Sequence, residues 1–199
     1  TKENSKVAFK ERLTKQTSDT EFVVPDTFVS LSRSKEAEAY VKRVGSYDAY
    51  LNGLADIRYD FQQERVVYLV KHNNKIVDAT GRSLNERKPK WRRYGNSRYP
   101  FLSGNGLCGI IVEDCPSACS ISNLAVGISL MGTSLLDEHI DVIKQFKKVY
   151  IALDKDATGK AILMMKKLRN YVPTKLIVLN KDLKDMQIGE RNEFIRRYI

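Results

Sequence analysis

Residues 149–156 are Val-Tyr-Ile-Ala-Leu-Asp-Lys-Asp, an apolar run that ends in two acids. A short run with β-branched residues predicts a buried strand, and the helical spacing of apolar residues over 161–168 predicts a helix after it. Residues 110–112, Ile-Ile-Val, followed by Glu113, repeat the arrangement. Strands that alternate with helices form parallel sheets, whose ligands bind at the carboxyl ends of the strands. The sequence therefore predicts an α/β fold with acids gathered at one edge of a parallel sheet.

Three of these acids, Glu113, Asp154 and Asp156, are the candidate catalytic residues and metal ligands. Asp154 and Asp156 are two residues apart, so on an extended backbone their side chains point to the same side, and Glu113 is expected to join them from a neighbouring strand. Carboxylates gathered in one crevice repel one another unless a cation neutralises them, and their oxygens suit Mg²⁺ or Mn²⁺. The alternative of ordinary solvated acids at strand ends stays open.

Two segments resemble the Toprim domain shared by bacterial-type primases, topoisomerases and some nucleases. They are Val112–Ala118 and Leu153–Ala161, and the second contains the pattern Asp-x-Asp-x-x-Gly. Related primases carry a further acidic element after their next strand, and here Lys-Asp-Leu-Lys-Asp follows the apolar residues 176–179. The resemblance makes Asp182 and Asp185 candidates for outer or second-metal contacts, with a plain polar turn as the alternative.

Residues 65–82 predict a β-hairpin, because two apolar runs flank the turn sequence His-Asn-Asn at 72–74. The hairpin resembles the amino-terminal part of the primase polymerase core, where an Arg follows a Gly and a Pro-Lys-aromatic element comes soon after. Gly81-Arg82 and Pro89-Lys90-Trp91 stand at those positions. The resemblance covers about residues 25–199, and it favours bacterial-type primases of the phage branch over topoisomerases and Toprim nucleases.

Positive charge is concentrated in one part of the chain. Lys and Arg total 34 against 24 Asp and Glu, a net charge of +10, which is typical of proteins that bind polyanions. Residues 82–99 hold seven basic residues, one acid and three aromatic residues. Cations neutralise phosphates and aromatic rings stack on unpaired bases, so this stretch predicts binding of a single strand or a nucleotide, with a solvated charged loop as the alternative. The candidate binding residues are Arg82, Lys90, Trp91, Arg92, Arg93 and Arg98.

Three parts are expected along the chain. Residues 1–24 form a linker or a short helix, 25–105 a smaller mixed α+β basic subdomain, and 106–199 a Toprim-like parallel-sheet domain with helices on both faces. The boundary rests on the turn composition of residues 102–106, Leu-Ser-Gly-Asn-Gly. The expected elements are a helix at 34–44, strands at 108–113, 127–131, 148–154 and 175–179, and helices at 116–125, 135–146, 158–171 and from about 190.

The chain departs from the family pattern in two ways. Related primases place Gly directly after the Toprim Glu and a second acid four residues beyond it, whereas this chain has Asp114 and Ser117. Bacterial-type primases also usually carry an amino-terminal zinc ribbon. Cys108, Cys115 and Cys119 form no Cys-x-x-Cys pair, so they indicate reduced core thiols. A core cut from a longer protein and a protein that has lost the ribbon both stay open.

The predicted function is that of a DNA primase, a nucleotidyltransferase that makes RNA primers on single-stranded DNA during replication by two-metal chemistry. The expected partners are a single-stranded DNA template and ribonucleoside triphosphates, with a zinc-ribbon module and a replicative helicase outside this chain. The sequence has no apolar run of about eighteen residues and no secretory signal, which predicts an intracellular protein without a membrane span, in the host cytoplasm if it is from a phage. The alternatives are a Toprim nuclease, which would cleave without nucleotides, and a single-stranded DNA-binding module that Ser117 has weakened catalytically.

Overall fold

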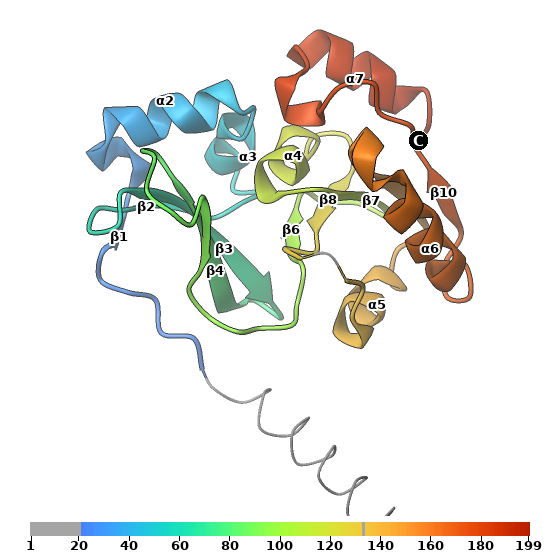
Figure 1. Cartoon of the computed structure of the whole chain (residues 1–199), viewed down its shortest axis with the longest axis horizontal. Coiled ribbons are helices and arrows are strands. Elements are labelled where there is room, and N and C mark those ends of the chain that lie inside the picture. The colour runs from blue at the N-terminus through green and yellow to red at the C-terminus, as the bar shows by residue number, and fades with distance from the viewer. Residues whose placement is uncertain (1–20, 133) are drawn as a thin grey trace, which may run out of the picture.

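The computed structural model describes residues 21–132 and 134–199, which form two five-stranded sheets (Figure 1). The linker or short helix expected at 1–24 lies outside the described residues up to position 20, and residues 21–24 belong to no helix or strand. No helix in the described ranges is long and apolar enough to cross a membrane.

The first sheet is antiparallel, and its strands follow the order of the chain. They are β1 (Phe28–Val29), β2 (Ile57–Asp60), β3 (Arg65–His72), β4 (Lys75–Ser83) and β5 (Trp91–Arg93). The predicted hairpin is confirmed as β3 and β4, joined by Asn73 and Asn74 at φ 49° and 63°, left-handed values that Asn tolerates in a two-residue turn. Between β1 and β2 lie the 3₁₀ helix η1 (Leu31–Arg33) and the helices α2 (Lys35–Arg43) and α3 (Tyr47–Leu51). Ser34 caps α2, which lies within the helix expected at 34–44.

The second sheet has the strand order β10–β9–β7–β8–β6, and the first four of these strands are parallel. This confirms the predicted Toprim-like α/β architecture after an antiparallel unit. The strands are β6 (Phe101–Ser103), β7 (Cys108–Val112), β8 (Val126–Ser129), β9 (Lys148–Ala152) and β10 (Thr174–Leu176). The connecting helices are α4 (Cys115–Ser120), α5 (Asp137–Ile143), α6 (Thr158–Leu168), α7 (Ile188–Arg196) and the 3₁₀ helices η2 (Lys155–Ala157) and η3 (Leu183–Asp185).

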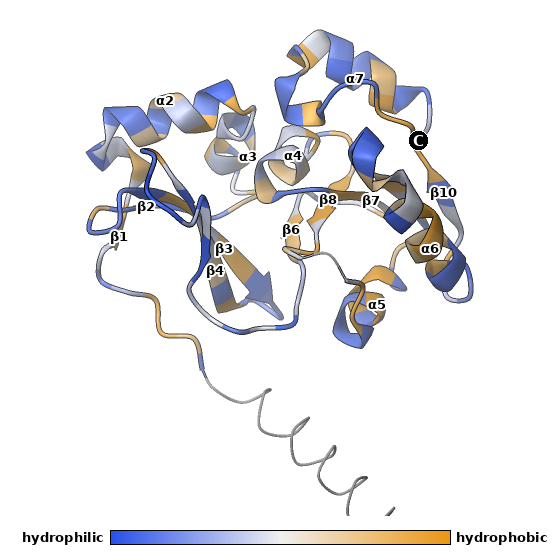
Figure 2. Cartoon of the chain, in the orientation of Figure 1, coloured by the Kyte–Doolittle hydropathy of each residue, from blue (hydrophilic) through white to orange (hydrophobic). Residues whose placement is uncertain are grey.

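Helices cover both faces of the second sheet, as predicted. Successive strand residues face opposite sides, so Ile110 and Tyr150 share a core with α4 and α7, whereas Ile111 and Ile151 share a core with α5 and α6. The first of these cores continues into the first sheet. At the junction, the ring of Tyr68 in β3 meets the ring of Phe101 in β6 edge to face, with the ring centres 5.9 Å apart. Figure 2 shows the apolar residues along the strands and on the helix faces that cover them.

Several local predictions were wrong. Residues 102 and 103, expected in a turn, belong to β6, which pairs antiparallel with β8 as an edge strand. Residues 91–93, expected in a loop, form β5 and pair with Thr80–Arg82 of β4. Both strands have three residues, too few to show a periodic pattern, and pairing with a distant strand defines them. The helices expected at 116–125 and 135–146 are shorter, and residues 121–125 continue α4 as turns.

The division of the chain near residue 105 stays a prediction. β6 precedes that position and yet belongs to the second sheet. Cys115 and Cys119 are buried in the shared core, and burial raises the pKa of the Cys119 thiol to about 12.

Candidate active site

The candidate catalytic acids follow two neighbouring strands of the second sheet. β7 and β9 are parallel and in register, with Val112 opposite Ala152, so both chains leave the sheet at the same edge. Glu113 is the first residue after β7, and Asp154 is the second after β9. The topology therefore brings the two segments together as the sequence predicts.

The expected extended arrangement of Asp154 and Asp156 was wrong. β9 ends at Ala152, Asp154 stands at the N-cap position of the 3₁₀ helix η2 without a capping side-chain hydrogen bond, and Asp156 lies within that helix. Burial and then the charge of Asp154, followed by those of Asp114 and Asp156, raise the pKa of the Glu113 carboxyl, while Lys160 opposes them. The three predicted acids thus lie in one electrostatic field despite the tight turn.

The same field extends to the segment after β10. Burial and then the charge of Asp182 raise the pKa of Asp154, with smaller contributions from Asp114 and Asp156, and Lys184 opposes them. We call Glu113, Asp114, Asp154, Asp156 and Asp182 the acidic cluster. Asp185 lies outside it, because its side chain is exposed on η3 and is not among the charges that shift these pKa values.

Sequence reasoning missed Lys184, which lies inside the acidic cluster. Its Nζ is 2.8 Å from Asp114 Oδ2 and 2.5 Å from Asp182 Oδ2. Burial lowers the pKa of Lys184, but the two carboxylates outweigh burial and hold it well above its ordinary value. The sequence signal for Lys184 was its place two positions after Asp182, in the acidic element that follows β10.

Ser117 also contacts this part of the cluster. Its hydroxyl donates to Asp182 Oδ1 at 3.1 Å, and its backbone N–H donates to Asp114 Oδ1 at 2.9 Å, so Asp114 caps α4. Asp114, which follows β7 one residue after Glu113, therefore has a structural role as a cap and an ion-pair partner.

The donor chemistry of Glu113, Asp154 and Asp156 fits a hard divalent cation. Their carboxylate oxygens are the ligands that Mg²⁺ and Mn²⁺ prefer, and burial, together with the neighbouring acids, raises the pKa of Glu113 and of Asp154. Within residues 21–132 and 134–199, no three His, Cys, Asp or Glu side chains already form a group that could hold a metal. The acids therefore act on one another electrostatically without forming a ready-made ligand set.

The charges of Arg82 of β4 and of Asp114 in the acidic cluster both act on Tyr40 of α2. Arg82 is opposite Trp91 in the β4–β5 register, and its guanidinium carbon is 5.8 Å from the centre of the Trp91 ring. Burial raises the pKa of Tyr40 to about 12, and the charges of Arg82, which lowers it, and of Asp114, which raises it, also act on this side chain, so Tyr40 is near both Arg82 and the acidic cluster. Arg82 Nε is buried and has no hydrogen-bond partner among the residues described. Such a group is available to an anionic ligand.

The other predicted binding residues differ in what they contact. Lys90 and Arg92 are exposed on the edge strand or next to it, and Arg92 contacts the neutral side chain of Gln63 at 2.9 Å. Arg93 and Arg98 are paired with carboxylates, Arg93 with Asp78 at 2.6 Å and Arg98 with Glu138 at 2.7 Å. Alternation along β5 places Arg92 on the face opposite to Trp91 and Arg93.

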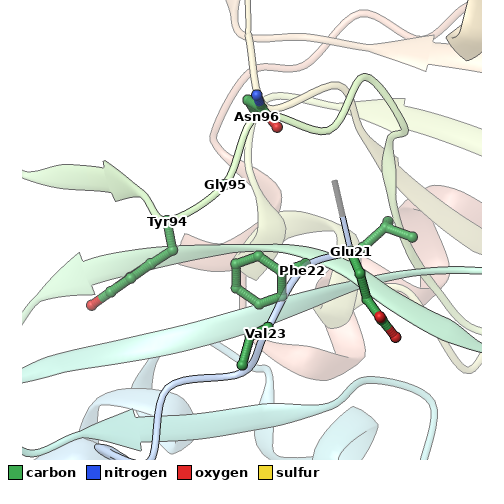
Figure 3. A pocket seen from close by; sticks show the side chains of 7 residues that line it. Glu21, Phe22, Val23, Tyr94, Gly95 and Asn96 are labelled. Atoms are coloured by element: carbon green, nitrogen blue, oxygen red, sulfur yellow. The ribbon is translucent and has the colours of Figure 1, made fainter. Parts of the chain in front are cut away.

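Two hollows help to place the candidate site. A cavity of about 30 Å³ lies beside Glu113 and Lys160, with Met164 and Leu153 in its wall, so it adjoins the acidic cluster. A wider one of about 500 Å³ lies at the outer side of the first sheet, where Figure 3 shows Phe22 and Val23 next to Tyr94. Its lining residues are Glu21, Phe22, Val23, Val77, Tyr94, Gly95 and Asn96. None of them belongs to the acidic cluster.

The segment that holds the parallel strands and the acidic cluster is similar to one known family. Residues 113–187 match the Toprim-like family, so the chain contains a Toprim-like domain. This match includes all five acids of the cluster together with Ser117 and Lys184.

The described chain as a whole has the fold of a primase catalytic core. It is similar to the catalytic core of Escherichia coli primase, with 15% identity and a TM-score of 0.64 over 84% of this chain and 75% of that one. It is also similar to a DNA primase domain from Pseudomonas aeruginosa (16% identity, TM-score 0.57, 85% and 61% covered). A DnaG primase catalytic domain bound to single-stranded DNA matches with 16% identity and a TM-score of 0.54, over 84% and 60%.

The chain spans about three fifths of the length of the last two of these structures. No curated protein matches its sequence. The structural likeness therefore establishes the fold of this chain.

Proposed function

We propose that this chain is the nucleotidyl-transfer core of a DNA primase, which joins ribonucleotides on a single-stranded DNA template. The observation that carries the proposal is the acidic cluster at the carboxyl edge of the second sheet, with Arg82 of the first sheet close enough that its charge and that of Asp114 act on the same Tyr40 side chain. The fold thus brings together negative groups that could hold a cation and a positive group that could hold a phosphate. Transfer of a nucleotide from a triphosphate needs both.

Glu113, Asp154 and Asp156 would hold the metal, because their oxygens are the donors that Mg²⁺ or Mn²⁺ prefers. When bound, the divalent cation supplies charge stabilisation to the attacking 3′ oxygen and the leaving pyrophosphate. Asp182 and Asp185 were expected as further contacts. Asp182 is engaged by Lys184 and Ser117, and Asp185 is exposed outside the cluster, so the proposal rests on the first three acids.

Arg82 would bind the triphosphate, since its fork of N–H donors suits phosphate oxygens and its Nε has no partner among the described residues. Trp91, half-buried beside Arg82, offers a ring face to a base. Lys90 and Arg92 would contact template phosphates from the exposed edge of the first sheet. Arg93 and Arg98 would act mainly by holding the basic segment in place through Asp78 and Glu138.

The proposal places the protein in DNA replication inside a cell. A zinc-ribbon module that selects the template and a replicative helicase would be separate parts or partners, because the two described sheets are both assigned to the proposed polymerase core.

The test is primer synthesis on single-stranded DNA with labelled ribonucleotides and Mg²⁺ or Mn²⁺. Asp154→Asn should lower the rate by at least about 100-fold, the range for losing one group that stabilises charge in a transition state. Asp141→Asn is the matched control, because Asp141 is an exposed acid on α5 paired only with Lys144, and its removal should leave the rate unchanged.

Equal synthesis by the wild type and Asp154→Asn would refute the assignment of the site. Metal-dependent cleavage of the template without nucleotides, lost in the same variant, would instead identify a Toprim nuclease.

A single-stranded DNA-binding module is the second candidate, and one observation favours it. Ser117 and Lys184 occupy both oxygens of Asp182, which reduces the number of free carboxylates in the cluster. Such a module would bind single strands without turnover, and its affinity would be the same in the wild type and in Asp154→Asn.

A further inference from the structure

Lys184 is held in the acidic cluster from both sides. Its Nζ contacts Asp114 Oδ2 at 2.8 Å and Asp182 Oδ2 at 2.5 Å, and its side chain is less than a quarter exposed. Asp114 is fixed in turn because it caps α4, and Asp182 is fixed by the Ser117 hydroxyl on its other oxygen. The ammonium group therefore sits between two positioned carboxylates.

The backbone that carries Lys184 is also fixed. Leu183 is fully buried, and the buried Arg191 of α7 donates from Nη1 to the carbonyls of Leu183 and Met186 at 3.3 and 3.2 Å. These bonds hold η3 on both sides of Lys184. The position of the lysine is thus built into the fold, unlike that of an exposed surface lysine.

Charge divides the acidic cluster into two halves. Asp114 and Asp182 share the positive charge of Lys184 at hydrogen-bond distance. Glu113 and Asp154 lack a partner at that distance among the described residues, and Lys160 acts on Glu113 only through its field. A divalent cation on Asp182 would meet the ammonium group across a shared carboxylate, where like charges repel.

We propose that Lys184 is a resident cation that takes the place of one metal ion, so that this site binds a single divalent cation, on the half formed by Glu113, Asp154 and Asp156. The inference rests on the proposed function, which assigns metal to that half. It changes the predicted two-metal arrangement to one metal and one lysine, and it makes Lys184 a positioning residue for the cluster.

The test counts Mn²⁺ bound to the whole chain, without nucleotide, by titration calorimetry and by electron paramagnetic resonance of the free ion. The wild type should bind about one equivalent, and Lys184→Gln, which frees Asp114 and Asp182, should bind about two. Adding Asp182→Asn to Lys184→Gln should return the count to about one.

Two variants act as controls. Lys184→Arg keeps a cation in the cluster and should bind about one equivalent even if Lys184→Gln folds poorly. Lys181→Gln removes an exposed lysine from the same loop and should also leave the count at about one.

Two equivalents of Mn²⁺ bound to the wild type would overturn the role of Lys184 and leave the assignment of a cation to Glu113, Asp154 and Asp156 intact. A count that stays at one in folded Lys184→Gln, with the ion lost on adding Asp154→Asn, would do the same. No Mn²⁺ bound to either the wild type or Lys184→Gln would overturn the metal assignment of the proposed function as well.

Discussion

The carboxylates of the two sheets differ in how their charge is satisfied. In the first sheet, Asp78 is fully buried and accepts from the N–H groups of Ala79, Gly95 and Ser97 and from Arg93 Nε. At the edge of the second sheet, Glu113 and Asp154 have raised pKa values because burial and neighbouring acids disfavour their charge. The comparison teaches that buried charge with a full set of donors serves the fold, whereas crowded charge without donors is available for a ligand.

The largest expected effect follows from removing Asp78. Asp78→Ala should lower the free energy of unfolding by about 3–5 kcal/mol, because it leaves four donors without their acceptor and breaks an ion pair whose carboxylate is fully buried. Urea unfolding measures the change. Asp141→Ala, an exposed control, should stay within about 0.5 kcal/mol of the wild type, and a similar small loss for Asp78→Ala would abolish the proposed contrast between the sheets.

The second-largest expected effect concerns Arg82, the candidate ligand of the triphosphate. Arg82→Ala should raise the KM for ribonucleotides by about 10- to 100-fold, the range for losing one charged hydrogen-bonding group. Steady-state primer synthesis measures it. Arg87→Ala removes an exposed arginine 3.6 Å from Glu64 and should leave KM unchanged. Equal effects of both changes would show that Arg82 contributes only to net charge.

The third effect is a gain in the free energy of unfolding, opposite in sign to the loss expected for Asp78→Ala. Asp154→Asn should raise the unfolding free energy by about 0.2–1 kcal/mol at neutral pH, because it relieves repulsion in a partly exposed cluster. A raised folded-state pKa of an acid means that stability is present below the ordinary value of 3.8 and is lost as pH rises through the raised pKa.

The stability gap between Asp154→Asn and the wild type should therefore open as pH rises from about 4 toward 7 and close in acid. Thermal unfolding over this range tests it. A variant that is less stable than the wild type at pH 7 would mean that Asp154 is satisfied in the same way as Asp78.

The smallest effect separates two neighbours in the basic segment. Arg92→Gln should make the plot of log affinity against log salt for single-stranded DNA shallower by about 0.7, the value for one lost phosphate contact. Arg93→Gln should leave the slope unchanged and lower stability, because Arg93 is the partner of Asp78. A slope change confined to Arg93→Gln would reverse the assignment of the two residues.

Much of the fold could be predicted from the sequence, because it is encoded in local patterns. The β3–β4 hairpin follows from its Asn-rich turn, and the alternation of strands and helices follows from apolar runs of short length. β5 and β6 could not be predicted in this way. Each has three residues, and pairing with a strand elsewhere in the chain defines each of them.

Likewise, only part of the candidate site could be predicted from the sequence. Glu113 and Asp154 could be placed together because both follow parallel strands, whose ends meet at one edge. The contact of Lys184 with Asp114 joins residues 70 positions apart, and the contact of Asp78 with Arg93 depends on how β5 pairs. No local pattern contains such contacts, so the partners of a charge had to be read from the structure.

The contact between Tyr68 and Phe101 has a consequence for how the protein unfolds. One core runs from the first sheet through these rings to Ile110 and Tyr150 of the second. When buried apolar contacts continue from one unit to the next, neither unit can open without exposing part of the core of the other. The two sheets should therefore behave as a single cooperative unit, and Arg82 keeps its place relative to the acidic cluster as long as that unit is folded.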